Sequence, residues 1–94
     1  MAVARVVTFE GVDPERVEGL RKRIEEEGRP EGIPATEIIV LHDPEERRSV
    51  SILFFENDDD YATGDETLNA VPADTTPGSR SSVGKYRVVM RMTV

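Results

Sequence analysis

The sequence predicts an α+β domain in which two helices cover one face of a four-stranded antiparallel sheet. Three observations support this prediction. Strand-like and helix-like patterns follow one another in the order strand, helix, strand, strand, helix, strand. The 94 residues are fewer than the roughly 150 of an average domain, so residues 1–94 are expected to form a single domain. Only 37% of the residues are hydrophobic, which predicts a modest core that a partner subunit would help to complete.

The first third of the chain reads as a strand followed by a helix. Val3–Phe9 is rich in β-branched residues and is followed by Gly11, which is typical of a strand and its end. Asp13 is suited to cap a helix whose first position is Pro14, and Gly28 ends it. An apolar stripe at spacings of three and four predicts that this helix buries one narrow face: Val17, Leu20 and Ile24.

The middle of the chain predicts a hairpin of two buried strands. Glu37–Leu41 and Val50–Glu56 each carry consecutive apolar residues, so both faces of each strand are expected to be covered. Between them, His42–Arg48 is a polar segment with an Asp-Pro pair, which is typical of a turn. A hairpin is the simplest connection for two such strands.

The last third predicts a second helix and a final strand. Asn57 and the acidic run Asp58–Asp60 suit the start of a helix, although its apolar stripe is thin and Gly64 interrupts it. Pro72–Ser82 is rich in Pro, Gly, Ser and Thr and is expected to be a loop. Lys85–Val94 is the clearest strand in the sequence, because apolar side chains at every second position alternate with mostly polar ones: Tyr86, Val88, Met90, Met92 and Val94 against Lys85, Arg87, Val89, Arg91 and Thr93.

This order of elements is that of the ferredoxin-like βαββαβ fold. Its two helices cover one face of the sheet, yet the two central apolar runs place hydrophobic side chains on both faces. The second face therefore needs a cover. A second copy of the chain, related by a two-fold axis, is the most economical one, so we expect a homodimer.

The segments SILFFEND (51–58) and GKYRVVMRMTV (84–94), together with the order of elements, resemble the dimeric α/β-barrel superfamily. This superfamily includes the antibiotic-biosynthesis-monooxygenase-like (ABM-like) proteins, and the resemblance extends over essentially the whole chain. It implies a dimer whose sheets face one another and a small-molecule pocket between sheet and helices in each subunit. In cofactor-independent monooxygenases and haem-degrading members, Asn, Trp and His residues serve that pocket. This chain has no Trp, a single His, and only Asn57 and Asn69, so the catalytic set does not carry over.

Net charge and cysteine content limit which partners and which cellular compartment are expected. Lys plus Arg (12) against Asp plus Glu (19) gives 12 − 19 = −7, which disfavours nucleic acid and anionic membranes as partners. The chain has no cysteine, and its uninterrupted aliphatic or aromatic runs are short. These features predict a cytoplasmic protein that is neither exported nor inserted in a membrane.

No metal or cofactor is expected. Asp58–Asp60, Asp65 and Glu66 are acidic, but they lack the spacing and the central glycine of a calcium-binding loop. Helix capping and the helix dipole explain three acids at a helix start.

A cluster of arginines is the first candidate binding site. If the apolar face of the last strand lies under the helices, Lys85, Arg87 and Arg91 project from the opposite face, where Arg5 of the first strand would join them. Guanidinium groups bind carboxylates and oxyanions through paired hydrogen bonds, so this cluster predicts an anion site. The alternative is that the arginines pair with Glu10, Glu37 or Glu56, on the same or a partner subunit.

Aromatic residues and the single histidine supply the other candidates. Phe54, Tyr61 and Tyr86 would line an apolar pocket, or they are ordinary core residues. Histidine is the side chain that ordinarily changes charge near neutral pH, so His42 is the candidate general base. The alternative is a solvated or capping histidine at the entry to a turn.

Three functions agree with these features. The first is a homodimeric α/β-barrel protein that binds a small organic molecule. The second is a cofactor-independent, monooxygenase-like enzyme acting on a phenolic or polycyclic substrate. The third is a purely structural dimer or interaction module without a pocket.

Overall fold

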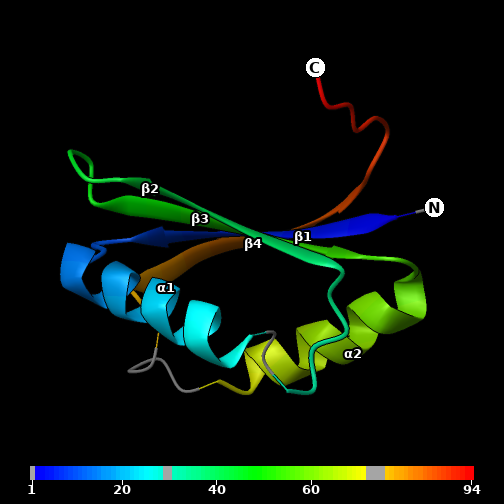
Figure 1. Ribbon diagram of the computed structural model, residues 1–94, viewed down its shortest axis with the longest axis horizontal. Coiled ribbons are helices and arrows are strands. Elements are labelled where there is room, and N and C mark those ends of the chain that lie inside the picture. The colour runs from blue at the N-terminus through cyan, green and yellow to red at the C-terminus, as the bar shows by residue number, and fades with distance from the viewer. Residues whose placement is uncertain (1, 29–30, 72–75) are drawn as a thin grey trace.

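The computed structural model describes residues 2–28, 31–71 and 76–94, which form a βαββαβ arrangement. Figure 1 shows a sheet with both helices on one side of it. The strands are ordered β2-β3-β1-β4, and every neighbouring pair is antiparallel. The predicted ferredoxin-like α+β fold is confirmed. The elements are β1 (Val3–Glu10), α1 (Pro14–Glu27), β2 (Glu37–Asp43), β3 (Arg48–Phe55), α2 (Asp58–Asn69) and β4 (Ser79–Arg87).

The register of the sheet defines which side chains face the helices. Val3 of β1 lies opposite Phe55 of β3 and Arg87 of β4, and residues directly opposite one another share a face. The helix-covered face of β1 therefore carries Val3, Arg5, Val7 and Phe9. The buried core on this face divides into two clusters. One contains Val3, Ile33, Ala35, Leu53, Phe55 and Tyr61, and the other contains Val7, Phe9 and Val12.

Helix α2 packs closely on the sheet. Asn57 caps it, because its side-chain oxygen accepts a hydrogen bond from the backbone N–H of Asp60 (2.7 Å). Tyr61 is buried and meets the ring of Phe55 edge to face, with ring centroids 5.6 Å apart. A Cβ at Gly64 would lie 2.6 Å from the Phe55 ring, so glycine at this position allows the close approach of helix and strand.

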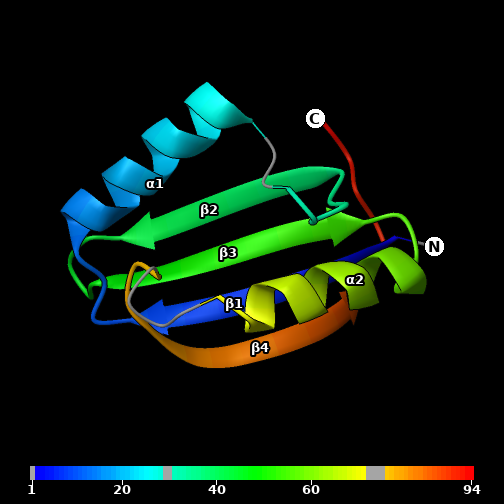
Figure 2. The same ribbon diagram turned by 90° about the horizontal axis from the view of Figure 1, so that it is seen from below.

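Helix α1 lies less closely on the sheet. Asp13 caps it as predicted, accepting a hydrogen bond from the Glu15 backbone N–H (2.9 Å), and Gly28 ends it. The predicted stripe faces the sheet, but it is only half-buried: no residue of the helix is fully buried, and Val17 packs against the cluster of Val7, Phe9 and Val12. A space of about 300 Å³ separates the helix from β2, lined in part by Val17, Leu20 and Ile24. In Figure 2, α1 lies near the β2 edge of the sheet, whereas α2 lies over β1 and β4 and runs nearly along them.

The β2–β3 hairpin is confirmed, with a slightly longer first strand than predicted. Asp43 begins the turn, and its Oδ1 accepts hydrogen bonds from the backbone N–H groups of Glu45 (3.1 Å) and Glu46 (3.3 Å). His42 lies within β2 and opposite Ser49, because the ladder continues to Asp43. His42 is thus a strand residue, and its assignment to the turn was wrong.

The final strand differs from its prediction at both ends. β4 begins at Ser79, inside the segment expected to be a loop, because Glu10 and Phe9 of β1 supply backbone partners there. β4 ends at Arg87, which lies opposite Val3, the first residue of β1. Residues 88–94 follow as an irregular segment, in which the Val88 N–H donates to the Ala2 carbonyl oxygen (3.0 Å) and Val89 is 93% exposed. These residues keep the alternating sequence pattern of a strand, but no described strand pairs with them.

Among the residues that the structure describes, no helix is long and apolar enough to cross a membrane.

Candidate functional site

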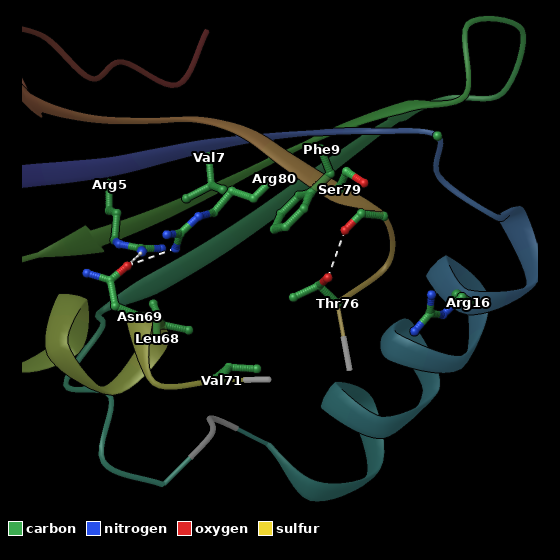
Figure 3. A pocket seen from close by; sticks show the side chains of 12 residues that line it. Arg5, Val7, Phe9, Arg16, Leu68, Asn69, Val71, Thr76, Ser79 and Arg80 are labelled. Atoms are coloured by element: carbon green, nitrogen blue, oxygen red, sulfur yellow. Dashed lines mark hydrogen bonds between the residues drawn. The ribbon is translucent and has the colours of Figure 1, made fainter. Parts of the chain in front are cut away.

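A cavity of about 470 Å³ opens between the sheet and the two helices. Its floor is the helix-covered face of β1, one wall is the end of α2, and Arg16 of α1 borders it from the other side (Figure 3). The start of β4 and the residues just before it complete the lining. The described lining residues are Arg5, Val7, Phe9, Gly11, Arg16, Leu68, Asn69, Val71, Thr76, Gly78, Ser79 and Arg80.

Two arginines converge on one amide at the end of this cavity. Arg5 Nη2 and Arg80 Nη1 both donate to Oδ1 of Asn69, at 3.1 and 2.8 Å, as Figure 3 shows. Arg5 Nε also donates to Asp65 Oδ1 (2.9 Å), and Asn69 Nδ2 donates to Asp65 Oδ2 (3.2 Å). Arg5 is only 3% exposed, so its charge needs a nearby partner, and Asp65 is that partner. The network holds the Asn69 amide in one orientation.

A β-bulge directs Arg80 into the cavity. Thr8 lies opposite Ser82, but the next residue, Phe9, lies opposite Arg80, so Ser81 is the extra residue of β4. Without the shift, Arg80 would lie opposite Glu10 and share the other face of the sheet. Instead it shares the helix-covered face with Phe9. The Ser81 hydroxyl donates to the Thr8 carbonyl oxygen (3.2 Å) at the bulge.

The charge of the lining is opposite in sign to that of the chain. The whole chain carries −7, yet the described lining includes three arginines and no acidic residue. Asp65 neutralises Arg5 from outside the lining. A partly apolar lining with guanidinium groups and no described carboxylate favours anionic molecules over cationic ones.

A second polar group lies at the start of α2. Lys85 Nζ is 3.0 Å from Asp58 Oδ1 and 4.9 Å from the centroid of the Tyr61 ring. The hydrogen bond from Lys85 lowers the pKa of the Asp58 carboxyl below its usual value. Burial is the main cause that raises the pKa of the Tyr61 phenol, and the charge of Asp65 raises it further. Because Lys85 contacts Asp58 and Tyr61 of α2, its side chain lies on the helix-covered face of the sheet.

The predicted arginine cluster on the open face does not form. Arg5 lies under α2, and Arg87 lies opposite Val3, on the helix-covered side. Only Arg91 reaches the open face, where it pairs with Glu37 and its guanidinium carbon lies 4.7 Å from the Phe54 ring centroid. The expectation was wrong because it assigned the wrong face of β4 to the helices. The pairing of Arg91 with Glu37 is the alternative that the sequence offered.

The aromatic candidates and the histidine lie outside this cavity. Phe54 and Tyr86 both lie opposite Ala4, on the open face, and Tyr61 is buried against Phe55. His42 borders the smaller space between α1 and β2. Both of its ring nitrogens are shielded from solvent, and neither is hydrogen-bonded to any described residue.

Sequence reasoning missed Arg16, Asn69 and Arg80 as site residues. Arg80 fell within the segment expected to be a loop, and its direction depends on the bulge, for which the sequence carries no clear signal. Asn69 stands at the end of α2, four residues after Asp65, a spacing at which helical side chains meet. This spacing was the feature of the sequence that could have indicated the hydrogen bond between Asp65 and Asn69.

The strand order and the paired helices define a ferredoxin-like α+β fold. No protein-family model matches this chain, and no curated protein matches it significantly. Its fold is similar to that of a solved protein from Chloroflexus aurantiacus J-10-fl, provisionally assigned as an antibiotic biosynthesis monooxygenase. The TM-score is 0.62, with 9% sequence identity over 99% of this chain and 98% of the other. The resemblance to ABM-like proteins is thus confirmed for the fold.

Proposed function

We propose that this chain is a homodimeric protein that binds a small organic molecule in the cavity between its sheet and helices. The observation that carries this proposal is the cavity itself. Its volume of about 470 Å³ lies within the range of roughly 300 to 1,000 Å³ that is typical of small-molecule sites. Apolar side chains form much of its lining, and a few polar groups converge at one end. Such a lining suits a ligand with one polar end.

The chemistry of the lining favours binding over catalysis. Its described residues offer guanidinium, amide and hydroxyl groups, but no carboxylate, imidazole, thiol or phenol that would ordinarily move a proton. The second candidate function is a cofactor-independent, monooxygenase-like enzyme acting on a phenolic or polycyclic substrate. It is favoured by the fold shared with the solved protein that carries that provisional assignment. In such an enzyme the substrate itself would have to supply most of the reactivity.

The open face of the sheet supports the homodimer. Neither α1 nor α2 covers this face (Figure 1), and apolar side chains from all four strands share it, Leu41 and Tyr86 being 53% and 59% exposed. An apolar sheet face of this kind is stabilised by burial against a second surface. A second copy would bring an identical apolar face and the same extended segment 88–94. The shared members are Ala4, Val6, Ile39, Leu41, Val50, Ile52, Phe54 and Tyr86.

Native mass spectrometry of freshly purified protein tests both parts of the proposal. We expect twice the chain mass plus a retained molecule of a few hundred daltons. Val71→Trp, at the rim of the cavity, should abolish the retained mass without changing the dimer. Ala62→Trp, at an exposed position of the preceding helix α2, is the control and should leave both unchanged.

Two further variants test the dimer. Tyr86→Glu places a charge on the open face and should yield monomers, whereas Val83→Glu, on the other face of the same strand, should remain dimeric. A monomeric wild type would overturn the dimer. A dimer that never retains or accepts a small molecule would instead favour the purely structural reading. Oxygen-dependent conversion of the retained molecule would favour the enzyme.

A further inference from the structure

We propose that the ligand of this cavity is a small organic acid, with Arg80 holding its carboxylate and the apolar floor holding its body. This inference rests on the proposed binding function and names the chemical class of the ligand. It is carried by the position of Arg80 and by the distribution of charge around the cavity, neither of which the ferredoxin-like fold requires.

The charge of Arg80 lacks a carboxylate partner within the described parts of the chain. Arg5, its neighbour in the network, is neutralised by Asp65 at 2.9 Å. Arg80 forms no ion pair with a described residue, and its hydrogen bond goes to the uncharged amide oxygen of Asn69. A guanidinium aimed at a cavity is suited to a carboxylate, because its planar N–H groups match two carboxylate oxygens.

The network orients Arg80 before any ligand arrives. The Asp65 carboxylate holds both the buried Arg5 and the amide nitrogen of Asn69, so the amide oxygen faces the two guanidinium groups. Arg80 donates one N–H to that oxygen, while its other N–H groups remain for a ligand. A side chain held in this way loses little conformational entropy when it binds an anion.

The remainder of the lining suits an apolar body rather than a second charged group. Val7 and Phe9 form the floor beside Arg80, and Leu68 of α2 and Val71, two residues beyond the helix, form a wall (Figure 3). Arg16 borders the cavity from the side of α1. A molecule with one carboxylate and a ring or short chain would satisfy both regions, since apolar burial and an ion pair would act together.

The test uses pairs of probes that differ only in charge. Benzoate, 2-naphthoate and octanoate are compared with benzamide, 2-naphthamide and octanamide, and with 2-naphthyl phosphate, by calorimetry on the full chain. We expect at least one acid to bind about tenfold or more tightly than its amide, and addition of salt should weaken that preference.

Variants assign the preference to Arg80. Arg80→Gln should remove most of the preference for the acid, and Arg80→Lys, which keeps the charge but loses the planar group, should retain part of it. Arg87→Gln is the matched control, because Arg87 is an exposed arginine of the same strand outside the lining, and it should bind like wild type. Unchanged melting temperatures would show that each variant is folded.

The possible failures can be told apart. Equal binding of acids and amides would overturn the carboxylate assignment and leave the small-molecule function standing. Tighter binding of the phosphate monoester would overturn it in favour of a phosphate ligand. Binding of no probe, together with no retained mass in the native spectrum, would overturn the proposed function as well.

Discussion

The two helices cover the same face of one sheet, yet they are attached to it in different ways. α2 buries Tyr61 and Gly64 and receives an ion pair from the buried Arg5 of β1. α1 buries no residue, and a space of about 300 Å³ lies between it and β2. The sequence suggested the reverse, because α1 has the clearer apolar stripe. How closely a helix packs therefore depends on the sheet surface beneath it as well as on the apolar stripe of the helix itself.

The surfaces beneath the two helices explain the difference. Under α2 the sheet presents the rings and branched chains of the larger buried cluster, with Phe55 fully buried. Under α1 it presents the edge strand β2 and the start of β3, where His42 and Ser49 lie opposite one another. The His42 ring nitrogens and the Ser49 hydroxyl oxygen are buried without a hydrogen-bond partner among the described residues. Polar atoms left in this state oppose close contact with an apolar helix face.

The prediction with the largest expected effect on stability compares one apolar side chain from each helix. Tyr61→Ala in α2 should lower the free energy of unfolding by about 3 to 5 kcal/mol, because it empties a well-packed site. Leu20→Ala in α1 should lower it by less than about 1.5 kcal/mol, because Leu20 is only partly buried and already borders an open space.

Urea unfolding at one fixed protein concentration measures both variants, since dimerisation would make the apparent stability depend on concentration. Equal losses would mean that α1 is docked as firmly as α2 and would remove the contrast between the helices.

The second prediction compares a glycine in each helix. Gly64→Ala should destabilise the protein by about 1 to 3 kcal/mol, because the new methyl group would overlap the Phe55 ring. Gly19→Ala should stabilise it by about 0.5 to 1 kcal/mol, since a Cβ there meets no described atom within 4 Å and alanine favours the helix. Thermal unfolding of the two variants gives opposite shifts. A gain in both would show that α2 can move away from Phe55 without loss.

The comparison also shows which features the sequence reveals. Helix starts at Asp13 and Asn57 and the β2–β3 hairpin were predictable, because capping residues and turn residues act through their immediate neighbours. The order of these elements was enough to predict the fold.

The site was harder to predict because it depends on distant pairing. The face on which Arg5 lies follows from the register of β1 with β3 and β4, and the direction of Arg80 follows from one extra residue at Ser81. The strand limits at Ser79 and Arg87 depend on where β1 can supply a backbone partner. None of these is a property of a short sequence window.

The smallest expected effect concerns the side chain that separates α1 from the sheet. His42→Leu should raise the free energy of unfolding by about 1 kcal/mol, because it removes two buried ring nitrogens that lack hydrogen-bond partners among the described residues. It also adds apolar contact with Leu20 and Ile24 across the same space. His42→Gln keeps a polar group at the position and should give no such gain. Urea unfolding of both variants measures the difference. If leucine and glutamine have the same effect, the loose attachment of α1 results from its place at the edge of the sheet rather than from the buried polar atoms beneath it.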